Sequence, residues 1–163
     1  MFIAVIGTVN GVNFTDGLDG LASSVTVLVA TFFTVVAIGT KSGISPITCA
    51  VVGALLGFLL FNVYPASVFM GDTGSMALGG AISAMAIFSR SVLLLAIMGG
   101  CFVASSVSCI LQVGSYKLRK KRIFKMAPLH HHFELLGYTE TRIVSVYMII
   151  TVLLCLVCLL AYL

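Results

Sequence analysis

Charged residues are scarce in this sequence. Only 9% of its 163 residues are Asp, Glu, Lys or Arg, whereas a soluble domain usually carries about 25%. Because so few charges cannot cover a water-facing surface, the composition excludes an ordinary soluble globular domain. The 60% share of hydrophobic residues and the mean hydropathy of +1.19 instead predict an integral membrane protein.

Two other signals are missing. No basic residue precedes the apolar run 1–9 and no small-residue cleavage site follows it, which argues against a secretory signal peptide. The five cysteines have no zinc-ligand spacing. All of them lie inside apolar runs, and we interpret them as small residues that face lipid or other helices: Cys49, Cys101, Cys109, Cys155 and Cys158.

Long charge-free segments dominate what is present. A spanning helix needs about 20 mostly apolar residues. This length predicts five spanning helices, at 19–39, 44–63, 74–89, 91–116 and 142–163. Residues 1–9 are too few to span and are interpreted as the end of a sixth helix. The predicted fold is therefore an all-α, polytopic transmembrane bundle, with residues 1–163 forming a single transmembrane domain.

The charges gather on one side of this predicted bundle. Because consecutive spans cross in opposite directions, the loops 10–18, 64–73 and 117–141 share one side. That side receives all five acidic residues, all three histidines and most of the basic residues, while the other receives only Lys41 and Arg90. The positive-inside rule then predicts that the side with the chemical groups is cytoplasmic.

The first segment with chemistry is NGVNFTDGLDGLA, residues 10–22. Its carboxylates Asp16 and Asp19 are three residues apart, so on a helical turn they share a face. A helix N-cap would explain one of them. It does not explain both beside Asn10 and Asn13, so we interpret this segment as functional.

The second segment is FMGDTGS, residues 69–75, which follows Asn62 and a helix-ending Pro65. Asp72 opens the next predicted helix, where free backbone N–H groups bind phosphate well. A carboxylate there could hold Mg²⁺, which prefers oxygen ligands and substrate phosphates. Phe69 could stack on a base, although its spacing alone favours interfacial packing.

The third segment runs from 117 to 142 and contains APLHHHFELLG, residues 127–137. Its basic cluster is typical of a topology signal and of contact with lipid headgroups. Three adjacent histidines on a helix point about 100° apart, so they cannot all ligate one metal. One or two could donate to phosphates or act as acid–base groups near neutral pH. Together the three loops predict metal-assisted phosphoryl transfer to a lipid at the membrane surface.

These motifs resemble the phospho-N-acetylmuramoyl-pentapeptide-transferase family, within the polyprenyl-phosphate N-acetylhexosamine-1-phosphate transferase superfamily. The resemblance implies transfer of phospho-MurNAc-pentapeptide from its UDP conjugate to undecaprenyl phosphate. The implied products are lipid I and UMP, in peptidoglycan biosynthesis that serves cell wall biogenesis, cell shape and division. It also implies a Mg²⁺ requirement, a bacterial plasma (inner) membrane location, a frequent homodimer and no nucleic acid partner.

The resemblance also implies a role for each motif residue. Asp72 matches the aspartate that binds Mg²⁺, and Phe69 matches a phenylalanine that stacks on uracil. Three groups complete the expected site, with Asn62, Asn13 and Asn10 for substrate binding, Asp16 and Asp19 as carboxylates of the nucleotide pocket, and His130, His131 and His132 as a histidine loop required for activity.

The chain departs from the family pattern in one respect. It matches only the C-terminal half, and it contains no Asp-Asp pair, a pair proposed to act near the metal and the lipid phosphate in the family. We therefore expect a truncated gene product or partial sequence that is inactive alone. Two alternatives stay open at this point, a sister enzyme that transfers GlcNAc-1-phosphate from UDP-GlcNAc and a non-catalytic membrane fragment.

Overall fold

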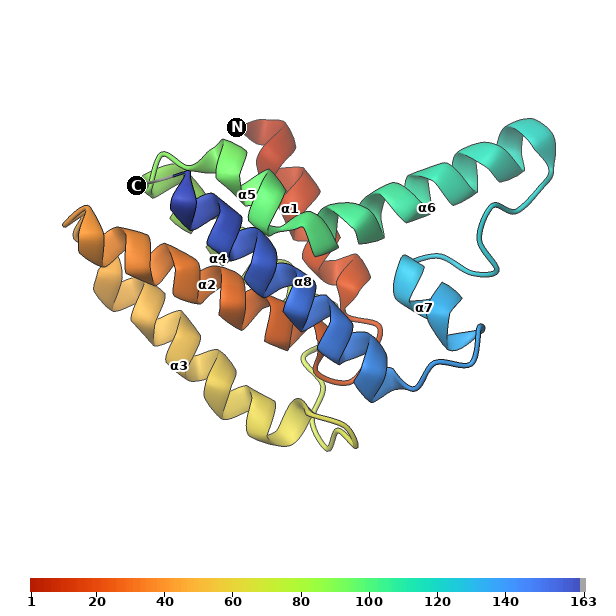
Figure 1. The fold of residues 1–163 in the computed structure, drawn as a ribbon, viewed down its shortest axis with the longest axis horizontal. Coiled ribbons are helices and arrows are strands. Elements are labelled where there is room, and N and C mark those ends of the chain that lie inside the picture. The colour runs from red at the N-terminus through yellow and green to blue at the C-terminus, as the bar shows by residue number, and fades with distance from the viewer. Residues whose placement is uncertain (162–163) are drawn as a thin grey trace.

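The computed structural model describes residues 1–161, and over that range it is all-helical, as predicted, without a strand. The described part contains eight helices (Figure 1): α1 (Phe2–Thr15), α2 (Leu21–Gly39), α3 (Ser45–Asn62), α4 (Gly71–Phe88), α5 (Val92–Met98), α6 (Gly100–Arg119), α7 (Leu129–Glu134) and α8 (Glu140–Leu160). The predicted all-α, polytopic helical bundle is confirmed.

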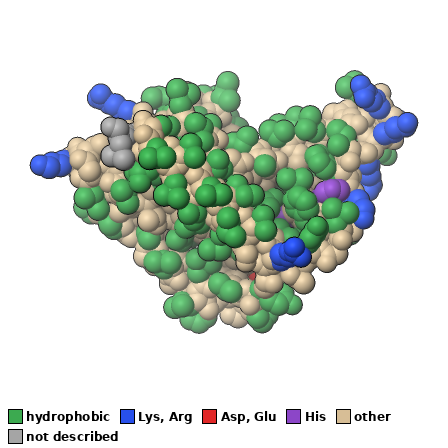
Figure 2. All heavy atoms as spheres, in the orientation of Figure 1, with side chains coloured by type: hydrophobic (Ala, Val, Ile, Leu, Met, Phe, Trp, Pro, Cys, Tyr) green, Lys and Arg blue, Asp and Glu red, His purple; other side chains and the backbone are tan. Residues whose placement is uncertain are grey.

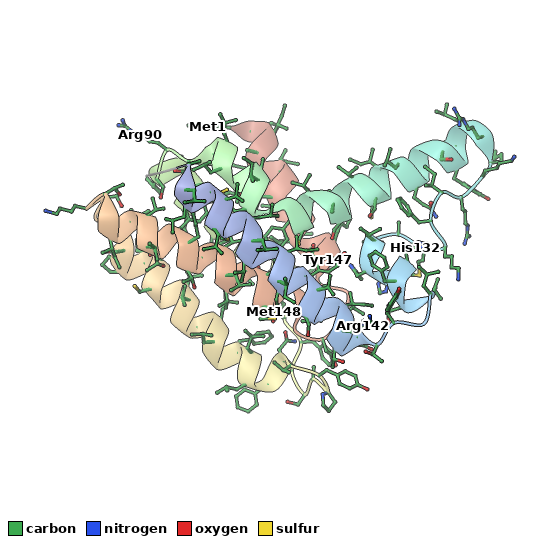
Figure 3. All side chains as sticks on the ribbon, viewed as in Figure 1. Met1, Arg90, His132, Arg142, Tyr147 and Met148 are labelled. Atoms are coloured by element: carbon green, nitrogen blue, oxygen red, sulfur yellow. The ribbon has the colours of Figure 1, made fainter. Side chains whose placement is uncertain are left out.

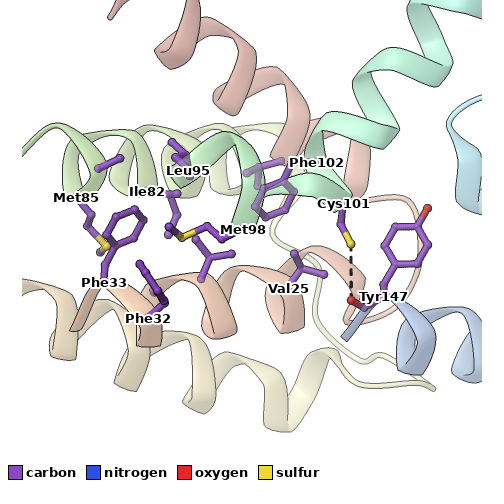
Figure 4. Close-up of a cluster of buried hydrophobic side chains, with 14 of the residues drawn as sticks. Val25, Phe32, Phe33, Ile82, Met85, Leu95, Met98, Cys101, Phe102 and Tyr147 are labelled. Carbon is purple, nitrogen blue, oxygen red and sulfur yellow. Dashed lines mark hydrogen bonds between the residues drawn. The ribbon is translucent and has the colours of Figure 1, made fainter. Parts of the chain in front are cut away.

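Helix α2 lies at the centre of the bundle. It packs against α3, α4 and α8, and Figure 1 shows α2, α3 and α8 side by side with nearly parallel axes, α3 running opposite to the other two. Because α2 is apolar on every face, it is stabilised when neighbouring helices surround it. Its buried Val25 and Phe33 meet Ile82 of α4 and Met98 of α5 in the main hydrophobic cluster (Figure 4).

Five spans were predicted, and four of the described helices, α2, α3, α6 and α8, are long and apolar enough by themselves to cross a membrane. Helix α4, predicted at 74–89, begins three residues earlier at Gly71 and is not in that set. Its first turn therefore includes Asp72 and Thr73, and these polar residues lower the hydropathy of the helix.

The predicted helix 91–116 is not continuous, because it is two helices that meet at Gly99. Glycine pairs weaken a helix and are a common position for kinks, and Gly99 and Gly100 form such a pair. Helix α5 stays with the bundle and packs on α8, whereas α6 packs on α1. In Figure 1 the far end of α6 projects away from the other helices.

Helix α1 is longer than predicted and runs through the segment 10–15, which was predicted to be loop. Its polar side chains are satisfied inside the helix, because Asn10 Nδ2 and Thr15 Oγ1 donate to carbonyl oxygens four residues earlier. Close packing on α4 fixes the helix, since a Cβ added at Gly79 would lie 2.6 Å from Val9 Cα. The first motif therefore begins on a helix and not in a loop.

The ends of the bundle carry different groups. Residues Thr40, Ser42, Arg90 and Ala161 line one cavity of about 760 Å³ at one end. Figure 3 shows Met1 and Arg90 near that end, with His132 and Arg142 near the opposite one. In Figure 2 the face in view is mainly apolar, with basic side chains toward its edges and over the end of α6. The predicted separation of the Arg90 turn from the motif loops therefore agrees with the fold.

Candidate active site

Three hydrogen-bonded or packed contacts bring the three motifs together. Ser75 Oγ of α4 donates to Asn13 Oδ1 of α1 over 2.6 Å, which joins the first and second motifs. The backbone N–H of Ala66 donates to Asp19 Oδ2 over 2.9 Å, which joins the loop 16–20 to the loop 63–70. Helix α7 completes the group by packing on Gly17.

Gly17 is where the histidine segment meets the aspartate loop. A Cβ added at Gly17 would overlap His130 Nε2 and would lie only 2.9 Å from His131 Nε2. Both imidazoles therefore direct a ring nitrogen at Gly17, the residue that follows Asp16. This approach is possible because glycine has no side chain to occupy the space.

The carboxylates of Asp16 and Asp72 lie close enough for their charges to interact. Asp16 follows the last turn of α1, and Asp72 lies in the exposed first turn of α4. Burial raises the pKa of the Asp16 carboxyl, and the negative charge of Asp72 raises it further. Among residues 1–161 the one ion pair is between His131 and Glu134, so neither aspartate has a basic side chain to neutralise it.

This donor set fits a small divalent cation in one specific way. The described residues hold no cluster of three or more His, Cys, Asp or Glu side chains that could bind a metal by themselves. Two uncompensated carboxylates are nevertheless what Mg²⁺ uses when substrate phosphates and waters supply its other ligands. Asp72, the predicted metal ligand, and Asp16 are the two carboxylates that this arrangement offers to such an ion.

Asp19 and Asn62 hold the second loop in place. Asn62 is buried, its Oδ1 accepts from Ser23 Oγ over 2.8 Å, and its Nδ2 donates to Val68 O over 2.9 Å. Asp19 holds the same loop through Ala66, as described above. The loop then presents Phe69 with 71% of its side chain exposed, where the ring is free to stack on a planar ligand.

The three adjacent histidines have three different environments. His130 is fully buried, and within residues 1–161 neither of its ring nitrogens has a hydrogen-bond partner. Burial, followed by the nearby His131, lowers the pKa of His130 to about 4, so the ring is neutral at pH 7.

His131 Nδ1 lies 2.5 Å from Glu134 Oε2. His132 points elsewhere, since its Nδ1 accepts from the backbone N–H of Lys125 over 3.1 Å and its ring packs edge-on against Phe124. The structure therefore brings two of the predicted histidines, His130 and His131, to Gly17 and turns the third away.

Two residues that matter here were absent from the predicted site. Gln112 of α6 uses its whole amide to hold the segment before α7. Its Oε1 accepts from Ile123 N and Phe124 N, and its Nε2 donates to Phe124 O, all within 3.0 Å. The signal was the single glutamine of the sequence inside a charge-free apolar run. Glu134 is the other, and its spacing of three from His131 was its signal.

The sequence profile described as glycosyl transferase family 4 matches residues 1–90, which include the first two motifs. The chain is 60% identical to phospho-N-acetylmuramoyl-pentapeptide-transferase of Clostridium novyi (strain NT) over 151 residues, covering 92% of this chain and 46% of that protein.

The proteins of that name from Clostridium acetobutylicum and Acetivibrio thermocellus are 56% and 54% identical over 157 and 156 residues. These matches cover 96% and 94% of this chain, and 49% and 47% of the two relatives. The chain thus spans about half the length of the curated relatives it matches, and the predicted resemblance to their family is confirmed.

Proposed function

The chain belongs to glycosyl transferase family 4, and from this premise we propose that it forms the nucleotide-sugar side of a membrane phosphotransferase. The donor is UDP-MurNAc-pentapeptide and the acceptor is undecaprenyl phosphate, giving lipid I and UMP. The names of the relatives with 54–60% identity support this assignment. The single observation that carries it is the meeting of all three motifs around Gly17.

The site residues divide the work of binding. Phe69 is exposed at the tip of its loop and stacks on the uracil ring of the donor. Asp19 and Asn62 keep that loop in position through the contacts with Ala66, Ser23 and Val68. The buried, neutral His130 fills the space on one side of Gly17.

Asp16 and Asp72 are the side chains that would hold Mg²⁺. Bound there, the ion would neutralise charge on the donor diphosphate, since phosphoryl transfer depends mainly on positioning and charge stabilisation. Asp72 keeps its carboxylate exposed to solvent and substrate, while the partly buried Asp16 would provide the second oxygen donor. Transfer then requires the lipid phosphate to reach the same end of the bundle.

We place this end at the cytoplasmic face of the inner membrane. The long run of lysines and arginines between α6 and α7 supports the placement, because cytoplasmic loops carry the excess of basic residues. The homodimer and the single transmembrane domain stay predictions.

The test is UMP release from UDP-MurNAc-pentapeptide with undecaprenyl phosphate and Mg²⁺, in membranes that contain this chain. We expect release when an N-terminal half from one of the relatives is co-expressed, and none from the chain alone, because its sequence contains no Asp-Asp pair. UDP-GlcNAc replaces the donor in a parallel reaction. Preference for UDP-GlcNAc, or release that is absent under every condition, would contradict the proposed function.

A further inference from the structure

Glu134 is the one acidic residue that α7 carries, and it has a specific partner. It follows His131 by three residues, so the two side chains lie on the same face of the helix. Their closest atoms, His131 Nδ1 and Glu134 Oε2, are 2.5 Å apart. Both side chains are partly buried, with 24% and 31% of their surfaces exposed, so the pair is shielded from full competition with water.

The pair determines where the proton of the His131 ring lies. A carboxylate only accepts hydrogen bonds at neutral pH, so Nδ1 of His131 must carry the hydrogen. In the neutral ring the other nitrogen, Nε2, then has a free lone pair. That nitrogen is the atom directed at Gly17, 2.9 Å from the position a Cβ would take.

His132 has the opposite arrangement. Its Nδ1 accepts a hydrogen bond from Lys125 N, so in its neutral form the hydrogen lies on Nε2. Adjacent histidines in one short helix are therefore held in different tautomers by different partners. The difference follows from the separate partners of the two rings, Glu134 for His131 and the N–H of Lys125 for His132, and not from the sequence HHH.

We propose that Glu134 is a positioning residue, which holds the proton of His131 on Nδ1 and thereby presents the Nε2 lone pair to the loop between Asp16 and Asp19. This inference rests on the proposed function and adds a role within it. His131 Nε2 then accepts a hydrogen bond from a protonated phosphate or hydroxyl of a bound substrate. Carboxylate partners fix imidazole orientation in this way in many protein sites.

The first test measures the tautomer directly and needs no activity. The whole chain, with ¹⁵N-labelled histidine rings, is placed in lipid nanodiscs at a pH where the imidazoles are neutral, and the ring nitrogens are observed by NMR. His131→Gln and His132→Gln identify the signals. We expect a proton on Nδ1 of His131 and on Nε2 of His132 in the wild-type chain.

Variants of Glu134 then separate orientation from mere folding. Glu134→Ala should move the His131 proton to Nε2, the form preferred without a partner, and should leave the His132 signals unchanged. Glu134→Gln should retain much of the Nδ1–H form, because its side-chain carbonyl can still accept the hydrogen bond. Glu140→Ala, a control at the neighbouring acidic residue, should change neither. A proton on Nε2 of His131 in the wild-type chain, or no response to Glu134→Ala, would overturn the proposal.

The second test uses UMP release in membranes that also contain the complementary half. Removing an orienting partner typically costs about 10–100-fold, so Glu134→Ala should lower kcat by that factor with little change in KM for the donor. Glu134→Gln should recover most of the loss, and Glu134→Ala should add nothing to His131→Ala. Unchanged kcat in Glu134→Ala would overturn the catalytic part of the inference. If the wild-type chain and the complementary half together release no UMP, this would count against the proposed function. The NMR result would still decide the orientation of the His131 ring.

Discussion

Replacing Gly17 by alanine is the smallest change that should separate the histidine segment from the aspartate loop. The added Cβ would overlap His130 Nε2, and it would lie 2.9 Å from His131 Nε2 and 3.2 Å from His130 Cε1. His130 is fully buried, so its ring has little room to move. Gly17 has no positive φ, and the substitution therefore acts through this collision and not through backbone strain.

The expected size of the effect differs between stability and activity. Forcing an extra carbon into a packed site costs about 1–3 kcal/mol, which should lower the midpoint of thermal unfolding in detergent. A displacement of about 1 Å near reacting groups can cost about 100-fold in rate. We therefore expect Gly17→Ala to lower UMP release by about that factor in membranes with the complementary half, while most of the protein remains folded.

A matched control and a second-site change make this test decisive. Apart from the adjoining backbone of α4, no described atom lies within 4 Å of a Cβ added at Gly80, so Gly80→Ala should be tolerated and should favour the helix. Adding His130→Ala to the Gly17→Ala variant should restore part of the lost thermal stability, because removing the imidazole empties the space that the new Cβ enters. If Gly17→Ala were as stable and active as Gly80→Ala, the proposed contact between the two segments would be refuted.

Three other substitutions test separate parts of the site. Asp72→Asn should abolish Mg²⁺-dependent UMP release, which the UMP assay with and without Mg²⁺ checks. The metal-free chain should lose stability as pH rises through the raised pKa of Asp16, and Asp72→Asn should reduce that loss because one cause of the raised pKa is gone. Thermal unfolding at several pH values checks this second result. The wild-type chain should lose stability on the order of 3 kcal/mol as pH falls from 6.5 toward 4, because unfolding then lets the buried neutral ring of His130 accept a proton. His130→Gln should remove that loss, and unchanged acid sensitivity of the variant would contradict this. Phe69→Ala should weaken UDP binding by calorimetry while changing stability by less than about 0.5 kcal/mol, because the ring is exposed; equal affinity in both proteins would remove the stacking role.

The long helices could be predicted from the sequence because they depend on local composition. Helices expected at 19–39, 44–63 and 142–163 occur at Leu21–Gly39, Ser45–Asn62 and Glu140–Leu160. In each case an apolar run of membrane length must form internal backbone hydrogen bonds, whatever surrounds it. The separation at Gly99 could not be predicted in this way, because an apolar run with two glycines is also compatible with one continuous helix.

The sequence by itself determined the class of fold and the kinds of chemical group in the site. Carboxylates, amides and histidines in three motifs indicate phosphate and nucleotide chemistry because few other ligands need that combination. Only the tertiary structure decided how these groups divide their roles. Whether a histidine is buried like His130, paired with a carboxylate like His131 or turned away like His132 depends on residues beside it in space. The contact of α7 with Gly17 joins positions more than a hundred residues apart in the sequence. Neither segment has a local pattern from which this contact could be predicted.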